Sequence, residues 1–331
     1  MRRVILCLAA ALLLGGCGAK QQPASAQIFA MDTYMELQVY GSEELLTQVE
    51  ELIYSLEKAV SVTDEQSELY AVNRDGAGEL GELAAGLLTS ALDMCRRTGG
   101  ALDISVYPVV RAWGFTTGDY RVPEREELDA LLELVDYTAV DFDGACITLA
   151  EGMEIDLGSV AKGYAGEKAA ELLRSGGVES ALLNLGGNVQ AVGSKPDGSA
   201  WRVAVKDPSG SGYLGVIELS DQAAVTSGGY ERYFEQDGKT YWHIIDPATG
   251  CPAESGLISV TVVGDSGLTC DALSTALFVM GLDAAAEFWA ANDDFEAVLV
   301  AENGEIYVTE GLSECFTPAD ESAEVTVIAR D

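Results

Sequence analysis

Two short segments of the chain carry side chains whose types and spacing could support catalysis. The first, residues 243–250, begins with His243, the only histidine in the sequence. In the second, Asp271, Ser274 and Thr275 would lie together on one side of a helix, opposite an apolar stripe. A histidine can accept a proton near neutral pH, and a carboxylate with a hydroxyl one helical turn away offers oxygen ligands for Mg²⁺. The two segments therefore predict metal-assisted chemistry on a phosphate.

Each of these segments also has an explanation that involves no chemistry. A single histidine is more often a hydrogen-bonding part of the structure than a catalyst. Asp271 could cap the N-terminus of a helix, with Thr275 exposed on its surface. Spacing alone leaves both alternatives open.

Two glycine-containing segments could contact an anionic ligand. In residues 155–164, Asp156 and Lys162 stand where a turn leads into a helix, and the N-terminus of a helix favours anions. The alternative is an ordinary strand-to-helix turn with a solvated lysine. Residues 183–189 contain a glycine pair, which favours a tight bend between strands, although such a bend could pack beside a cofactor.

These segments must be positioned by a mixed set of helices and strands. We expect a single α/β (α+β) domain of mostly antiparallel strands flanked by helices, because no repeat or linker divides the chain. Gln236-Asp237-Gly238 and Asn303-Gly304 predict hairpin turns. Apolar periodicity predicts helices over residues 43–61, 86–98, 124–134, 165–175, 271–280 and 284–292, and strands over 33–40, 180–184, 188–192, 201–206, 216–219, 230–235, 239–244, 257–263, 297–301 and 306–309.

The composition limits the kinds of partner. The formal net charge is −35, which argues against nucleic acid, because phosphate contacts need lysine and arginine. An anionic substrate would be repelled at long range, so a phosphate ligand would need a cation or a local basic group. No zinc-binding spacing is present, and mostly free thiols, with at most one disulfide, are expected among cysteines 95, 146, 251, 270 and 315.

The N-terminus predicts export and a lipid anchor. Two arginines precede an apolar run over residues 4–14, which at 11 residues is too short to cross a bilayer. Small residues then lead into Cys17, as in the lipobox of bacterial lipoproteins, so we expect cleavage before Cys17 and acylation of its thiol. An ordinary secretory signal with a chance cysteine is the alternative. The expected organisation is a signal peptide over residues 1–16, a tether over 17–27 and one domain over 28–331, held at the outer face of the bacterial cytoplasmic membrane.

Taken together, the motifs resemble those of the ApbE-like flavin transferases, which are FAD:protein FMN transferases. The resemblance covers essentially the whole mature chain in order, and family members are commonly exported lipoproteins. The motifs that carry it are Met31-Asp32-Thr33, Ser67-Glu68-Leu69 with Asn73, residues 101–108 with Trp113-Gly114-Phe115, Asp156-Leu157-Gly158 with residues 161–164, Asn184 with Gly186-Gly187, Thr226-Ser227-Gly228, residues 243–250, and Asp271-Ala272 with Thr275.

The resemblance implies a T-fold-like core, a reaction and a set of site residues. Mg²⁺ and FAD bind, a threonine or serine hydroxyl of a client protein attacks the FMN phosphorus, and AMP leaves. The client would be an exported or membrane-bound electron-transfer protein. His243 would be the general base, and Mg²⁺ would be held by Asp271, Thr275 and the backbone carbonyl of Ser159. FAD would contact Met31, Ala101, Leu102, Asp103, Asp156, Lys162, Ile245 and Ser274.

Two positions depart from the family pattern. Tyr107 stands where many relatives have a small residue, and Thr63 stands where many have an aromatic residue near the isoalloxazine ring, so we expect a reshaped flavin pocket.

Two other functions would use the same site. One is an FAD pyrophosphatase, in which water replaces the client hydroxyl, and the other is a lipoprotein that binds FAD without chemistry.

Overall fold

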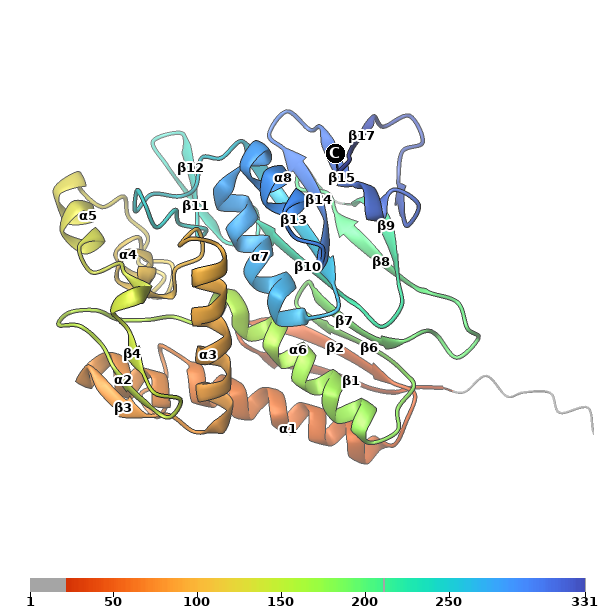
Figure 1. The fold of residues 1–331 in the computed structure, drawn as a ribbon, viewed down its shortest axis with the longest axis horizontal. Coiled ribbons are helices and arrows are strands. Elements are labelled where there is room, and N and C mark those ends of the chain that lie inside the picture. The colour runs from red at the N-terminus through yellow and green to blue at the C-terminus, as the bar shows by residue number, and fades with distance from the viewer. Residues whose placement is uncertain (1–21, 211, 331) are drawn as a thin grey trace, which may run out of the picture.

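A nine-stranded sheet forms the centre of the molecule (Figure 1). The computed structural model describes residues 22–210 and 212–330, so the predicted signal peptide and Cys17 lie outside the described residues. Neighbouring strands are antiparallel, except that the last two run parallel. In spatial order the strands are β1 (Ala24–Ala30), β2 (Thr33–Val39), β6 (Ser180–Leu185), β7 (Asn188–Gly193), β10 (Ala223–Gly228), β13 (Leu257–Gly264), β14 (Phe295–Ala301), β15 (Ile306–Thr309) and β17 (Val325–Ile328).

Helices cover one face of this sheet, and two of them carry much of the site. These helices are α1 (Glu43–Val60), α6 (Gly158–Ser175), α7 (Gly267–Met280) and α8 (Leu282–Ala290), and α3 (Glu82–Arg97) packs against α1, α6 and α7. Figure 1 shows α6 and α7 in front of the strands. Helix α7 packs on β10 and β13 and also against α6, so nearly its whole circumference is buried. This arrangement confirms the predicted α/β class, with mostly antiparallel strands flanked by helices.

A smaller sheet covers part of the opposite face. Its strands, in spatial order, are β16 (Phe316–Pro318), β9 (Tyr213–Leu219) and β8 (Trp201–Lys206). Trp201, Ile217 and Phe316 pack there against Val298 of the central sheet and form a second hydrophobic core. The central sheet is therefore buried on both faces over its middle strands.

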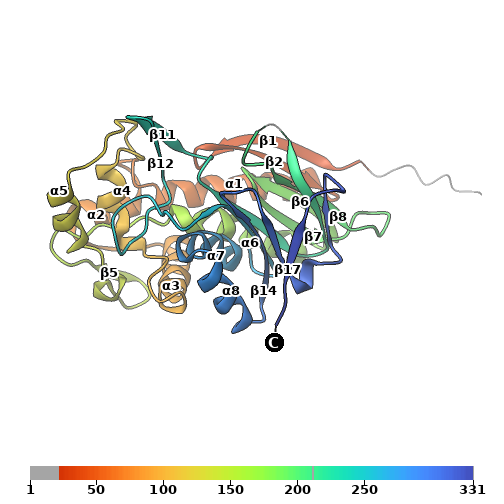
Figure 2. The same ribbon diagram turned by 90° about the horizontal axis from the view of Figure 1, so that it is seen from above.

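The remaining elements lie beyond one end of the central sheet (Figure 2). A third small core joins helix α4 to the hairpin of β11 and β12 through Val109, Trp113 and Phe234. The helices there are α2 (Glu68–Asp75), α4 (Tyr107–Ala112), α5 (Arg125–Leu132), η1 (Ile104–Val106) and η2 (Tyr137–Ala139). The strands there are β3 (Ala77–Glu79), β4 (Asp141–Phe142), β5 (Cys146–Thr148), β11 (Tyr233–Gln236) and β12 (Lys239–Trp242). The short helix η3 (Glu310–Leu312) lies instead beside the central sheet, against β14.

Several predicted boundaries were wrong. Strand β1 begins at Ala24, so residues 24–27 belong to the sheet and not to a tether; small alanines alternate there with polar residues and give little apolar signal. Helices α3, α6 and α7 begin at Glu82, Gly158 and Gly267, earlier than their periodicity indicated. In α6 and α7, Gly163 and Gly267 lie where the two helices approach too closely for a side chain, so these positions give no apolar signal.

The cysteines agree with the expectation of mostly free thiols. All five cysteines in the described part of the chain are free thiols, of which Cys95 and Cys270 are buried. Among residues 22–210 and 212–330, no helix has the length and apolar character needed to cross a membrane.

Helices α6 and α7 approach most tightly at Gly163. A Cβ atom there would lie 2.2 Å from the carbonyl oxygen of Gly267 and 2.6 Å from the Cβ of Asp271. Because backbone atoms cannot rotate away, we expect Gly163→Ala to lower the free energy of unfolding by about 1–3 kcal/mol, measured by urea denaturation. Gly210→Ala is the control, since a Cβ would meet only open space at that position. An unfolding midpoint equal to the parent's in Gly163→Ala would contradict the packing described.

Candidate active site

Asp271 lies inside helix α7 and faces helix α6. The N-cap of α7 is Ser266, whose hydroxyl accepts from the N–H of Thr269, so Asp271 is not a capping residue. The Asp271 side chain is buried, and its Oδ2 accepts a hydrogen bond of 2.8 Å from the N–H of Gly163. Burial raises the pKa of Asp271, while the charge of Lys162 and the bond from Gly163 act in the opposite direction. A buried carboxylate that keeps one oxygen hydrogen-bonded can present the other to a cation.

The two other predicted metal ligands, Ser159 and Thr275, belong to the same pair of helices as Asp271 and Gly163. In a regular helix the N–H of Gly163 faces the carbonyl of Ser159, four residues earlier, and this same N–H lies 2.8 Å from Asp271 Oδ2. Regular helix geometry therefore predicts that the Ser159 carbonyl lies near the Asp271 carboxylate. Thr275 follows Asp271 by one turn on the same side of α7.

The donor set fits Mg²⁺ better than a softer metal. It consists of one carboxylate, one hydroxyl and one carbonyl, all of them hard oxygen ligands. No group of three or more His, Cys, Asp or Glu side chains that could hold a metal occurs in the described ranges. A site with a single carboxylate leaves coordination positions for water and for phosphate oxygens, which is the usual arrangement for Mg²⁺.

Ser227 of strand β10 connects the hydroxyl groups of Ser274 and Thr275 in helix α7. Its hydroxyl lies 2.7 Å from the hydroxyl of Ser274 and 3.2 Å from that of Thr275. Ser274 is fully buried and also donates to the carbonyl of Asp271 at 2.8 Å. Ser274, predicted to touch FAD, is thus enclosed in protein in this structure, and it supports Asp271 and Thr275. The sequence motif around Ser227 was noticed, but its role in the site was missed.

His243 follows strand β12 and is oriented by the opposite strand. The carbonyl of Arg232 accepts from the backbone N–H of His243 at 3.1 Å, and it also lies 3.1 Å from Nδ1 of the imidazole. A carbonyl can only accept, so Nδ1 carries the proton and Nε2 is left free to accept one. Burial lowers the pKa of His243 to about 4, helped by the charges of Arg232 and Lys162. The imidazole is therefore neutral at pH 7.

A tight turn fixes the register that places His243. Asp237 and Gly238 form the predicted hairpin turn with φ angles of 53° and 77°. This turn pairs Tyr233 with Trp242, so that the next pair along the hairpin is Arg232 and His243. A shift of one residue would move the imidazole to the other face of the hairpin.

Asp156 and Lys162 lie in the same electrostatic neighbourhood as His243. Burial raises the pKa of Asp156, and the N–H of Gly158 and the charges of Arg232 and Lys162 oppose that rise. The Asp156 Oδ1 accepts from the N–H of Gly158 at 2.9 Å, at the start of helix α6. The charges of Lys162 and Arg232 thus act on both Asp156 and His243.

Asn73 of helix α2 anchors the strand-like segment that carries Asp156. Its amide donates to the carbonyl of Ile155 and accepts from the N–H of Ile155, both at 2.8 Å. Asn73→Ala would leave both backbone groups without a partner, so we expect the free energy of unfolding to fall by about 1–3 kcal/mol and FAD affinity to weaken as Asp156 shifts. Thermal unfolding and flavin fluorescence measure the two effects.

A graded control exists at the same position. Asn73→Asp keeps an acceptor for the N–H of Ile155 but loses the donor, so its stability should lie between the parent and Asn73→Ala. If both variants matched the parent in stability and FAD affinity, the anchoring role would be wrong.

Met31 and Asp32 occupy a strained turn between β1 and β2. Their φ angles are 50° and 59°, which residues other than glycine seldom adopt. The N–H of Met31 donates to a carboxylate oxygen of Glu57 in helix α1 at 2.6 Å, which stabilises the turn. The predicted flavin contact at Met31 is therefore held in a fixed position at the end of the hairpin.

Several other predicted flavin contacts have side chains that face the protein interior. Asp103 accepts from the N–H and the hydroxyl of Ser105 and from the N–H of Tyr137. Leu102 and Ile245 are buried in hydrophobic cores, and Ala101 packs partly buried against one. The backbone of residues 101–103 remains the part of that loop able to contact a ligand.

Of the two departures from the family pattern, Tyr107 is buried and Thr63 is exposed.

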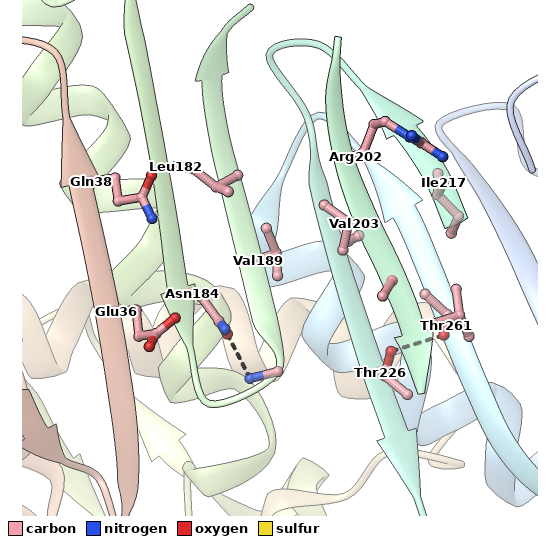
Figure 3. Close-up of a pocket in the computed structure, with 14 residues that line it drawn as sticks. Glu36, Gln38, Leu182, Asn184, Val189, Arg202, Val203, Ile217, Thr226 and Thr261 are labelled. Carbon is pink, nitrogen blue, oxygen red and sulfur yellow. Dashed lines mark hydrogen bonds between the residues drawn. The ribbon is translucent and has the colours of Figure 1, made fainter. Parts of the chain in front are cut away.

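A cavity of about 270 Å³ lies on the opposite face of the central sheet (Figure 3). Glu36, Asn184 and Thr226 line it from the central sheet. Neighbouring residues of a strand point to opposite faces, so Thr226 faces this cavity while Ser227 faces helix α7. No predicted site residue lines the cavity. It is also bordered by the bend between β6 and β7, where Asn184 accepts from Gly187 at 2.9 Å, as the glycine pair predicted.

The assembled site can be compared with those of known proteins. Residues 31–299 match the ApbE family. The chain belongs to the ApbE family. It is 33% identical over 295 residues to the FAD:protein FMN transferase of Vibrio cholerae, covering 85% of this chain and 88% of the relative. It is 31% identical to the FAD:protein FMN transferase of Treponema pallidum, covering 85% of each chain.

Solved structures of the ApbE family share this fold. The ApbE protein of Thermotoga maritima superposes with a TM-score of 0.83 at 34% identity, covering 89% of this chain and 99% of that one. The flavin transferase ApbE of Vibrio cholerae gives 0.79 at 28% identity, with the same coverage. These relatives confirm the predicted family and identify the protein as an enzyme of the flavin-transferase type.

Proposed function

We propose that this enzyme transfers FMN from FAD to a threonine or serine hydroxyl of a client protein and releases AMP. The curated relatives are named for flavin transfer to protein. The single observation that carries the proposal is the orientation of His243. Its Nδ1 bonds to the Arg232 carbonyl, which leaves Nε2 free, and the charge of Lys162 acts on the imidazole. That arrangement provides a proton acceptor beside positive charge, as attack of a hydroxyl on a phosphate requires.

The chain's own residues would act on each part of the reaction. The client oxygen forms a bond to the FMN phosphorus while the bond from that phosphorus to the AMP oxygen breaks, and AMP leaves with the electron pair. His243 Nε2 accepts the proton of the attacking hydroxyl. Lys162 offsets the charge of the pyrophosphate, which the net charge of −35 would otherwise repel.

We propose Mg²⁺ as the cofactor, held by Asp271, Thr275 and the Ser159 carbonyl. Bound there, it would neutralise pyrophosphate charge and polarise the phosphorus. Ser227 and Ser274 fix the orientation of Thr275, and the N–H of Gly163 fixes the Asp271 carboxylate. Such supporting contacts matter because a ligand oxygen must be directed at the metal before it binds.

Mass spectrometry of a client domain tests the function. The enzyme is incubated with FAD, Mg²⁺ and an exported electron-transfer domain, and the client is examined for the added mass of FMN. Flavin on the client together with free AMP supports transfer. Free FMN and AMP with an unmodified client would indicate an FAD pyrophosphatase. FAD binding that persists in EDTA, with no AMP released, would indicate a carrier.

A lipid anchor at Cys17 would bring the enzyme to clients at the outer face of the cytoplasmic membrane. We expect Cys17→Ser to abolish incorporation of labelled palmitate and to release the protein from the membrane fraction, because the thiol is the acylated group. Cys7→Ser is the matched control, since Cys7 lies within the predicted signal peptide. Equal labelling of the parent and Cys17→Ser would contradict the anchor.

A further inference from the structure

Arg232 presents two different groups at the base of the β11–β12 hairpin. Its carbonyl orients His243, as described above. Its guanidinium is held only loosely, 3.4 Å from the carbonyl of Phe115 and 3.9 Å from the carboxylate of Asp32. The side chain is 42% exposed. The guanidinium is therefore available to a ligand, while the backbone of the same residue stays fixed.

The guanidinium of Arg232 lies close to His243. Arg232 donates to the carbonyl of Phe115, and the Phe115 ring packs against the imidazole with ring centroids 6.4 Å apart. The charge of Arg232 lowers the pKa of His243 and favours the ionised form of Asp156, and the charge of Lys162 acts on the same two groups. Two cations, one from a hairpin and one from a helix far apart in the sequence, therefore act on the same two side chains.

Arg232 differs from most other arginines in the described ranges. Arg74, Arg97 and Arg174 each lie within 2.5 to 2.8 Å of a carboxylate, so their charge is already compensated. Arg232 has no carboxylate at hydrogen-bond distance. In a chain with a net charge of −35, a weakly paired cation next to the general base is well placed to receive an anion.

We propose that the guanidinium of Arg232 binds the pyrophosphate of FAD, at the phosphoryl group that the client hydroxyl attacks. This inference rests on the proposed function. An arginine offers several N–H donors in a planar fork that matches two phosphate oxygens. Arg232 and Lys162 would together oppose the two negative charges of the pyrophosphate and the charge that develops as AMP leaves.

Asp32 competes with that ligand for the guanidinium. It lies in the strained turn next to Met31, with a φ of 59°, and asparagine tolerates this conformation as well as aspartate does. Asp32→Asn therefore removes the competing charge without disturbing the turn. If Arg232 binds the pyrophosphate, this substitution should tighten FAD binding.

The experiment measures FAD binding and turnover in four variants. Arg232→Gln removes the guanidinium charge but retains the backbone carbonyl that orients His243. Arg232→Lys retains a charge without the fork, and Asp32→Asn frees the guanidinium. Arg202→Gln is the control, because it removes the same charge from an exposed arginine on strand β8, at the cavity on the far face of the sheet. FAD affinity is measured by flavin fluorescence, and KM and kcat by AMP release.

We expect Arg232→Gln to raise the Kd for FAD and to lower kcat/KM by about 10–100-fold, with melting temperature unchanged. Arg232→Lys should recover part of this loss, Asp32→Asn should lower the Kd, and Arg202→Gln should match the parent. An Arg232→Gln enzyme within twofold of the parent in Kd, KM and kcat would overturn the proposal, whatever its melting temperature. If the parent neither transfers FMN nor releases AMP, the proposed function has failed, and the Kd for FAD alone decides the role of Arg232.

Discussion

His243→Ala is expected to reduce FMN transfer by at least about 10²–10⁴-fold while FAD affinity stays close to the parent value. In the proposed mechanism the imidazole Nε2 accepts the proton of the attacking hydroxyl, and general-base catalysis typically contributes a factor of this size. The ring makes its hydrogen bond through Nδ1 to the Arg232 carbonyl, and it packs edge-on against Phe115 with ring centroids 6.4 Å apart. FAD affinity is measured by flavin fluorescence and transfer by mass spectrometry of the client.

His243→Asn separates proton transfer from structure. The amide nitrogen of asparagine stands where Nδ1 of the imidazole stands, so it can still donate to the Arg232 carbonyl, but it cannot accept a proton near neutral pH. We therefore expect His243→Asn to fold as the parent does and to be as inactive as His243→Ala. Transfer at the parent rate in either variant would remove His243 from the mechanism.

The pH dependence of the parent enzyme checks the same role. A general base must be neutral before it accepts a proton, and burial with the nearby charges of Arg232 and Lys162 lowers the pKa of His243 to about 4. Activity that depends on the neutral imidazole is lost only as the pH falls through this value. The kcat/KM profile should therefore stay flat below the ordinary histidine pKa of about 6.5 and decline near pH 4. A decline centred near pH 6.5 would contradict the buried environment.

The sequence predicted those helices, strands and turns whose form depends on neighbouring residues in the chain. The Asp237-Gly238 pair forces a two-residue turn, so the hairpin that places His243 was visible in the sequence. The alternation of residues 33–40 and the periodicity of residues 43–61 were confirmed for the same reason. The family motifs then indicated which of these elements belong to one site.

Other features depend on contacts between distant segments, and the sequence could not show them. Helix α7 is buried on nearly every side, so its start at Gly267 has no amphipathic boundary. Ser227 acts through hydroxyl contacts with α7, and its strand was not predicted at all. Arg232 gains its place from the hairpin register, its exposure and the distance to Asp32. Each of these properties arises from packing between distant segments, which the spacing of residues along the sequence does not predict.

Asp271→Asn is expected to abolish Mg²⁺-dependent turnover and at the same time to stabilise the metal-free protein. Asparagine keeps an acceptor for the N–H of Gly163 but loses the charge that would bind the proposed metal, so kcat should fall by more than about 100-fold. Burial raises the pKa of Asp271 in the folded protein. A carboxyl group whose pKa is higher in the folded state stabilises the fold at pH values below its pKa in the unfolded chain. This stabilisation is lost as the pH rises through the pKa of the folded state. At pH 7 the buried charge therefore destabilises the metal-free fold.

The two effects of Asp271→Asn are separated by melting temperatures measured with and without Mg²⁺. Without metal, the variant should melt above the parent, because it no longer buries a charge that Lys162 and the N–H of Gly163 compensate only in part. With Mg²⁺ and FAD, the parent should gain stability by binding ligand in the folded state only, and the variant should gain much less. Glu287→Gln is the control, since it removes a charge from an exposed position on helix α8. A variant that melts below the parent without metal and responds equally to Mg²⁺ would show that Asp271 supports the α6–α7 packing and holds no cation.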